Sequence, residues 1–267
     1  MSETLSVRGL TKRFETGGRF LRQGQILTAV NNVSFDVAPG KTFGLVGESG
    51  CGKSTLARCL MRLTEPDAGC VMLGETDITA LSASDLFAVR PRMQIVFQDP
   101  YASLNPRRTI AQTLLEPLAT HRIGPPGTRL DRVVTLLEQV GLNASMLNRY
   151  PHEFSGGQRQ RVGIARALTL DPEVIVADEA VSALDVSVQS EVLNLLADIQ
   201  RARGLSYVFI SHDLAVVQHV SDQIGVMRHG ELVELGAAAD VFLRPQHAYT
   251  RRLLAAVPDM PSLAVRD

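Results

Sequence analysis

One nine-residue stretch constrains the fold of this chain more than any other part of its sequence. Residues 47–55 fit the pattern G-x-x-x-x-G-K-[ST], a glycine-rich loop that binds phosphates. An apolar run at 41–46 predicts a buried strand before the loop, and apolar residues at helical spacing predict a helix at 56–63. This order of strand, loop and helix predicts an α/β core. The stretch consists of Gly47, Glu48, Ser49, Gly50, Cys51, Gly52, Lys53, Ser54 and Thr55.

Each part of the loop has a physical role in holding a triphosphate. The glycines let the backbone turn so that successive N–H groups point at one anion, and the helix that follows adds the positive end of its dipole. Lys53 is expected to bring its charge to the β- and γ-phosphates, and the Ser54 hydroxyl can bind Mg²⁺. The alternative is a glycine-rich turn that contains Lys-Ser by chance, and the flanking strand and helix argue against it.

Short alternating segments before the loop predict a mostly antiparallel sheet at 5–10, 26–30 and 33–37, with turns at Asn31–Asn32 and Pro39–Gly40. After the loop, strands alternate with helices, which predicts a parallel sheet with right-handed crossovers. We expect an α/β fold with an N-terminal antiparallel β subdomain and an inserted α-helical subdomain. The later strands are expected at 92–97, 173–177 and 205–210. From 109 to about 147 the pattern turns helical, with two helices separated at 121–127 and an amphipathic segment at 131–140 that ends at Gly141. Further helices are expected at 159–170 and 190–201, with two short strands and a helical end within 224–257.

Polar residues directly follow three of the expected parallel strands, at the edge where α/β sheets carry their chemistry. Asp178 would hold Mg²⁺, and Glu179 would orient or deprotonate the water that attacks the γ-phosphate. A strand-ending Asp-Glu pair that faces solvent is the alternative. His212 could contact the γ-phosphate or be a structural histidine. Gln98 could bind Mg²⁺ and sense the attacking water, or be a turn amide.

A second glycine-rich helix start lies at Ser155, Gly156, Gly157 and Gln158. Such a start can bind an anion, yet residues 47–55 already account for one triphosphate. The second site predicts that the γ-phosphate of another subunit's ATP docks here, in a dimer with ATP between its subunits. The alternative is an ordinary helix N-cap.

Composition narrows the class of protein. The formal net charge is −1 and no basic run occurs, which gives no electrostatic reason to expect a nucleic-acid partner. The three cysteines form no metal-binding pattern and predict reduced thiols in the cytosol. We expect no signal peptide, and no apolar run reaches the roughly 18 residues of a membrane span. Work at a membrane would therefore need another protein as anchor.

Taken together, these motifs resemble the ATP-binding subunit of ABC transporters. The resemblance rests on the loop at 47–55, Gln98, Phe154-Ser-Gly-Gly-Gln158, the segment 174–179, Ser182-Ala-Leu-Asp185 and Ser211-His212. It implies a P-loop NTPase (RecA-like) fold, ATP and Mg²⁺ as cofactors, and ATPase activity. By the same resemblance Ser54 and Gln98 bind Mg²⁺, Glu179 is the catalytic base, His212 contacts the γ-phosphate, residues 155–158 close on the partner's ATP, and Asp185 lies at the dimer interface. Phe14 would stack on adenine, or else be a core residue at a strand end.

The resemblance covers residues 4–258 as one ATPase domain. It places the core at 3–97 and 166–235, the helical subdomain at about 99–165 and an importer-type tail at 236–267. Within the family, the chain is most similar to peptide and nickel importers, of the second-ATPase type. The stretches that carry this similarity are 98–106, 149–152, 186–189 and 245–254.

This resemblance implies a peripheral subunit at the cytoplasmic face of the plasma membrane. Its expected partners are a second ATPase subunit, either a sister protein or a copy of itself, two membrane-spanning permease subunits and, indirectly, a periplasmic solute-binding protein. The chain departs from the family pattern at Phe154, Ala180 and Ala248, and none of these changes removes a reacting group. The rival functions are a soluble ABC-type ATPase in DNA repair or translation, and a clamp that binds ATP without hydrolysing it.

Overall fold

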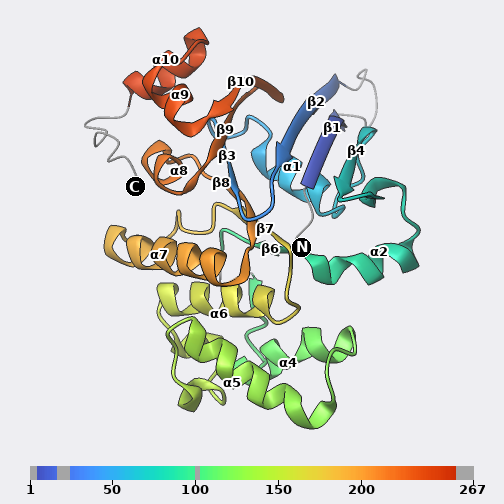
Figure 1. The fold of residues 1–267 in the computed structure, drawn as a ribbon, viewed down its shortest axis with the longest axis vertical. Coiled ribbons are helices and arrows are strands. Elements are labelled where there is room, and N and C mark those ends of the chain that lie inside the picture. The colour runs from blue at the N-terminus through green and yellow to red at the C-terminus, as the bar shows by residue number, and fades with distance from the viewer. Residues whose placement is uncertain (1–4, 17–24, 100–102, 257–267) are drawn as a thin grey trace. The chain divides into compact units, whose positions relative to one another are not determined.

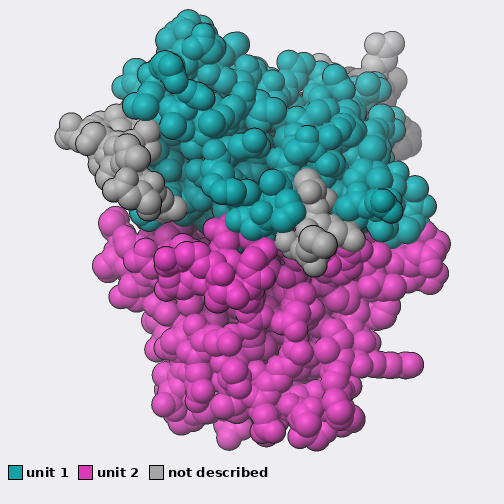
Figure 2. Space-filling view, in the orientation of Figure 1, with its two compact units in different colours: residues 1–81, 206–267 teal, residues 82–205 magenta. Residues whose placement is uncertain are grey.

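The computed structural model describes residues 5–16, 25–99 and 103–256. The chain forms two compact units, which Figure 2 distinguishes by colour. Unit 1 comprises residues 1–81 and 206–267, and unit 2 comprises residues 82–205. The finer subdomain boundaries expected from the sequence stay a prediction.

The N-terminal part of unit 1 is an antiparallel sheet, as the alternating sequence predicts (Figure 1). Its buried face carries the apolar residues of that alternation, such as Leu5 and Val7, while Arg8 is exposed. The strands follow the spatial order β2 (Gln25–Val37), β1 (Leu5–Thr16), β4 (Ala68–Leu73) and β5 (Thr76–Asp77).

The two asparagines predicted to form a turn lie inside β2, so that prediction was wrong. Asn32 has a φ of 52° and its backbone N–H donates to the Thr11 hydroxyl at 3.0 Å. The register of β1 and β2 shifts on both sides of this point. Asparagine tolerates the left-handed conformation, so one irregular step replaces the turn and the strand continues. The turn predicted at Pro39–Gly40 is confirmed.

The second sheet of unit 1 is mainly parallel and holds the strand that precedes the glycine-rich loop. β3 (Thr42–Val46) runs parallel to β8 (Ser206–Ile210) on one side and to β9 (Gln223–Arg228) on the other. β10 (Glu231–Ala237) pairs antiparallel with β9. Every residue of β3 and β8 is buried, as expected for strands covered on both faces. The helices of this unit are α1 (Lys53–Leu60), α8 (Leu214–Val220), α9 (Ala238–Leu243) and α10 (Ala248–Ala255).

Unit 2 combines a parallel strand pair with a group of helices. β6 (Met93–Val96) runs parallel to β7 (Val174–Asp178). The predicted helix end at Gly141 is confirmed: Gly141 has a φ of 75°, and the Leu142 amide donates to the Leu137 carbonyl at 3.0 Å, which together form a Schellman cap. The helices are α2 (Ala83–Val89), α4 (Ile110–Thr120), α5 (Arg129–Gln139), α6 (Gly156–Leu168) and α7 (Val186–Arg203).

Short 3₁₀ turns connect these elements at Ile78–Ala80, Arg90–Arg92, Pro126–Thr128, Ala144–Met146 and Pro151–Glu153. Among the helices that the structure describes, none is long and apolar enough to cross a membrane.

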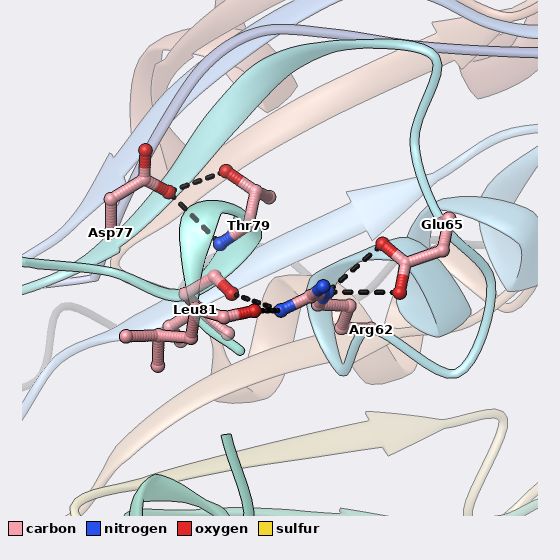
Figure 3. A network of polar contacts seen from close by, with 6 residues as sticks. Arg62, Glu65, Asp77, Thr79 and Leu81 are labelled. Carbon is pink, nitrogen blue, oxygen red and sulfur yellow. Dashed lines mark hydrogen bonds and ion pairs between the residues drawn. The ribbon is translucent and has the colours of Figure 1, made fainter. Parts of the chain in front are cut away.

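Arg62 fixes the end of the helix that follows the loop (Figure 3). It occupies the left-handed position of a Schellman cap on α1, with a φ of 48°. Its guanidinium pairs with Glu65 at 2.9 Å and donates to the carbonyls of Ile78 and Leu81. The side chain is only 15% exposed. One cation thus joins the C-terminal end of α1 to the segment after β5.

Replacing Arg62 tests this connection. We expect Arg62→Ala to lower the free energy of unfolding by about 1–3 kcal/mol, because it removes hydrogen bonds from a cation to half-buried carbonyls. Urea denaturation measures the change. Arg58→Ala is the control, since Arg58 is exposed on the same helix, and should change stability by less than about 0.5 kcal/mol. Equal effects of the two variants would contradict the role given to Arg62.

Candidate nucleotide-binding site

The glycine-rich loop joins β3 to α1, in the strand–loop–helix order that the sequence predicts. Lys53 is the first residue of α1 and is only 4% exposed. Its ammonium group donates to two carbonyls of its own loop, those of Gly47 at 2.7 Å and Glu48 at 3.0 Å. A buried cation is stable only when its donors are satisfied, so these bonds hold the loop around the charge. The loop is therefore built around a positive centre.

The backbone explains why glycine is needed here. A Cβ at Gly47 would lie 2.2 Å from the Met227 carbonyl oxygen, and one at Gly52 would lie 2.0 Å from the Ala29 carbonyl oxygen. Gly50 differs, because its φ is 79° while no described atom lies within 4 Å of its Cβ position. Two glycines thus permit close packing behind the loop, and the third permits a left-handed turn on its open side.

Cys51 lies on the packed side of the loop and is 7% exposed. Burial raises the pKa of its thiol above the usual range, although the nearby Lys53 charge acts in the opposite direction. The thiol therefore stays protonated at neutral pH, and is a small packing group rather than a reactive thiolate.

The structure brings His212 to the same sheet edge as the loop. β3 and β8 are parallel neighbours, with Leu45 opposite Ile210, and the Ser211 amide donates to the Leu45 carbonyl at 3.2 Å. His212 is exposed and lies two residues after Ile210, the last residue of β8, on the strand adjacent to β3. Asp213 then caps α8 by accepting from the Ala215 amide at 2.9 Å.

Asp178 and Glu179 lie at the corresponding end of β7 in unit 2. Asp178 is the last residue of the strand and is 8% exposed. Glu179 has a φ of 50°, a conformation that costs energy for a residue other than glycine. Its carbonyl accepts from both the amide and the hydroxyl of Ser182, at 3.1 and 3.0 Å. These two bonds support the tight turn that leads the chain out of the strand.

The second glycine-rich start is confirmed as a helix start, and α6 begins at Gly156, three residues earlier than expected. Ser155 and Gln158 form a capping box: the Ser155 hydroxyl accepts from the Gln158 amide at 3.3 Å, and the Gln158 side chain accepts from the Ser155 amide at 3.0 Å. A Cβ on Gly157 would lie 2.3 Å from a Val188 methyl group. Glycine therefore lets α7 approach α6 closely.

Asp185 is the N-cap of α7, a role that the sequence analysis did not assign. Its carboxylate accepts from the Ser187 hydroxyl at 2.7 Å and from the Val188 amide at 3.0 Å. These hydrogen bonds lower the pKa of the Asp185 carboxyl, so the cap keeps its charge well below neutral pH. The helix starts at Val186, four residues before the expected start.

Two further predicted residues lie on the surface of their units. Gln98 is exposed, two residues after the end of β6 in unit 2. Phe14 lies on β1 in unit 1, is 37% exposed, and has the Lys12 ammonium 5.4 Å from its ring centroid. This exposure excludes the alternative that Phe14 is a core residue. Its stacking on adenine stays a prediction.

The fold and the loop define a P-loop nucleotide-binding protein: a parallel sheet, a buried lysine in a glycine-rich loop, and a helix that starts at that lysine. The family model described as "ABC transporter" matches residues 30–182. The chain belongs to the ABC transporter family and is an ATP-binding subunit with ATPase activity.

Two relatives illustrate the similarity in sequence. The chain is 53% identical over 260 residues to a peptide import ATP-binding protein of Brucella ovis, whose name marks that assignment as provisional; the match covers 97% of this chain and 80% of that protein. It is also 53% identical over 255 residues to the glutathione import ATP-binding protein GsiA of Salmonella paratyphi A. That match covers 95% of this chain and 41% of GsiA.

Solved structures show the same fold. A dimeric, post-hydrolysis state of the ATP-binding cassette MJ0796 with ADP and Pi is 28% identical, with a TM-score of 0.76 over 88% of this chain and 98% of that one. The protein cbiO1 from Clostridium perfringens, part of an ABC transporter complex, is 25% identical, with a TM-score of 0.77 over 91% of this chain and 92% of that one.

Proposed function

We propose that this chain energises the import of a peptide or a similar small solute across the plasma membrane. The observation that carries the proposal is the 53% identity to a peptide import ATP-binding protein over 97% of this chain. The equal identity to a glutathione importer agrees with a peptide-like solute, since glutathione is itself a small peptide. These two relatives do not favour a repair or translation ATPase.

The residues of the loop fit a triphosphate. The buried Lys53 ammonium group donates to two carbonyl oxygens of the loop. Charged phosphate oxygens form stronger hydrogen bonds with an ammonium group than neutral carbonyl oxygens do. At Gly50 no described atom lies within 4 Å of the Cβ position, so the loop is open at this point. We infer that the full stretch from Gly47 to Thr55 binds the phosphates.

The oxygen donors expected to bind Mg²⁺ also suit this ion. Ser54 lies in the first turn of α1, Asp178 at the end of β7 and Gln98 after β6. A hydroxyl, a carboxylate and an amide oxygen are all hard ligands, which Mg²⁺ prefers. Mg²⁺ would neutralise charge on the phosphate oxygens when bound.

Glu179 is our candidate for the catalytic base. Its backbone is held in a left-handed turn by Ser182, which fixes the direction in which the side chain leaves the strand. A carboxylate placed in this way accepts a proton from the attacking water, and that water becomes the nucleophile at the γ-phosphorus. We assign His212 to contact with the γ-phosphate, because it leaves the strand next to the one that enters the loop.

We infer that the chain works as part of a larger assembly. The solved relative MJ0796 is dimeric, and we infer a dimer in which Ser155, Gly156, Gly157, Gln158 and Asp185 face the partner's ATP. Two permease subunits would anchor the chain at the cytoplasmic face of the plasma membrane. A solute-binding protein would deliver the cargo to those permease subunits.

A pull-down from membranes tests the proposed function. The tagged chain, isolated in mild detergent, is expected to carry multi-span permease subunits and an ATPase partner, identified by mass spectrometry. The Lys53→Ala variant is a control for dependence on nucleotide. Recovery of ribosomal or DNA-repair proteins in place of permeases would overturn the import proposal and leave the ATPase assignment standing.

A further inference from the structure

The C-terminal helix α10 reaches the phosphate loop through one side chain. The Glu48 amide donates to the Tyr249 hydroxyl at 3.3 Å, across 201 residues of sequence within unit 1. Tyr249 lies in the first turn of α10 and is 4% exposed.

Tyr249 is held firmly in this position. The Arg228 guanidinium lies 5.0 Å from the centroid of its ring, a distance typical of a cation–π contact. His247 caps α10 by accepting from the Tyr249 amide at 3.1 Å. The Glu234 carboxylate on β10 accepts in turn from the amides of Gln246 and His247, at 2.7 and 3.0 Å. The start of α10 is therefore tied to the parallel sheet.

The hydroxyl of Tyr249 remains neutral at physiological pH. Burial raises the pKa of this phenol, while the hydrogen bond from the Glu48 amide acts in the opposite direction. A neutral phenol keeps its own proton, and its oxygen can still accept a hydrogen bond from an amide, which is the role that the observed contact requires.

The bond reaches a residue of the loop that Lys53 also contacts. Tyr249 accepts from the Glu48 N–H, and the Lys53 ammonium donates to the Glu48 carbonyl at 3.0 Å. The Gly230 amide, between β9 and β10, donates to the Cys51 carbonyl at 2.9 Å. Gly230 and Tyr249 thus hold two residues of the loop by their backbone. Only the contact made by Tyr249 depends on a side chain, which a substitution can remove.

We propose that Tyr249 is a positioning residue for ATP binding, which couples the C-terminal helix α10 to the conformation of the phosphate loop. The proposal rests on the proposed role of residues 47–55 as the triphosphate site. Tyr249 acts on the loop and not on the phosphates: it fixes the Gly47–Glu48 peptide through its N–H, and the Lys53 ammonium binds the Gly47 carbonyl of that same peptide at 2.7 Å. Because coupling between two sites is reciprocal, ATP in the loop should also stabilise α10.

Tyr249→Phe tests the proposal, since it removes the hydroxyl and keeps the ring against Arg228. We expect the KM for ATP to rise about three- to tenfold, because one hydrogen bond that positions the loop is lost. We expect kcat to stay within about twofold of the wild-type value. Turnover is measured on the full chain in its detergent-solubilised membrane complex. Hydrogen exchange should show a faster Glu48 amide, and the protection that ATP gives to residues 248–255 should shrink. Thermal unfolding checks that the variant is folded.

Arg252→Ala is the matched control. Arg252 lies on the same helix α10 and its side chain is exposed. Its loss should leave the KM for ATP and the exchange of the Glu48 amide at wild-type values. An unchanged KM in Tyr249→Phe, or an equal rise in both variants, would overturn the proposal.

Lys53→Ala separates this inference from the assignment of the loop. If Lys53→Ala abolishes ATP binding and Tyr249→Phe has no effect, the loop assignment stands and the role of Tyr249 is wrong. If Lys53→Ala binds ATP as the wild type does, the loop assignment itself fails, and the inference about Tyr249 fails with it.

Discussion

Glu179→Gln is expected to bind ATP with wild-type affinity and to lose most of its turnover. The amide keeps the size and most of the hydrogen-bonding capacity of the carboxylate, yet it cannot accept a proton from the attacking water. A positioned general base contributes about 10²–10⁴-fold to a rate, and we expect a fall in kcat of that order. The turn around residue 179 should persist, because its hydrogen bonds from Ser182 go to the Glu179 backbone carbonyl.

Steady-state ATPase assays and equilibrium binding of radiolabelled ATP measure the two parts of this prediction. Glu191→Gln is the control: Glu191 is an exposed carboxylate on α7, paired with Arg161 at 2.8 Å, and its loss should leave kcat nearly unchanged. Undiminished hydrolysis by Glu179→Gln would exclude Glu179 as the base. It would move that role to another group at the site.

Structure is predicted most accurately from the sequence where it depends on residues that are close together in the chain. The loop at 47–55 could be recognised because its lysine, its glycines and the helix that follows are contiguous, and the hydrogen bonds from Lys53 to Gly47 and Glu48 close within the same stretch. The buried strands β7 and β8 are predicted for the same reason, since an apolar run of four residues needs no distant partner to be recognised.

The predictions that failed or fell short depend on partners far away in the sequence. Asn31–Asn32 has the composition of a turn, but pairing of β2 with β1 along its whole length and the hydrogen bond from Asn32 to Thr11 keep it within a strand. The helix α8 was not predicted, because seven residues give too short a pattern. Asp213 caps that helix, and a single capping residue is a weak signal on its own.

In the candidate site, too, contacts between residues far apart in the sequence escape prediction. Val186 and Ser187 were left outside the predicted helix, although Asp185 caps α7 in the structure. No periodicity connects Tyr249 to Glu48 across 201 residues, so sequence reasoning could recognise the tail as importer-like and still not connect it to the phosphate loop. The roles of Gln98, Phe14 and the glycine-rich start of α6 stay predictions.

Lys53→Ala is expected to abolish measurable ATP binding. Lys53 is one of three lysines in the chain and provides a buried ammonium at the first position of α1. Removing a charged partner of the phosphates costs about 3 kcal/mol or more at such a site, which corresponds to a loss of affinity of roughly 100-fold. Turnover should fall at least as far, since the same charge stabilises the transferring phosphoryl group.

Lys41→Ala is the matched control for this change. Lys41 precedes the same strand β3, but its side chain is 59% exposed and pairs with Asp222 at 3.0 Å. A surface ion pair of this kind contributes less than about 1 kcal/mol to stability, so ATP affinity should not change. Isothermal titration calorimetry compares the two variants.

Lys53→Met separates the loss of charge from the loss of packing. Lys53 also binds the carbonyls of Gly47 and Glu48, and methionine fills most of the vacated space without a charge. Wild-type affinity in Lys53→Met would mean that the loop binds its ligand through backbone amides alone, and the positive centre would then serve only to keep the loop folded.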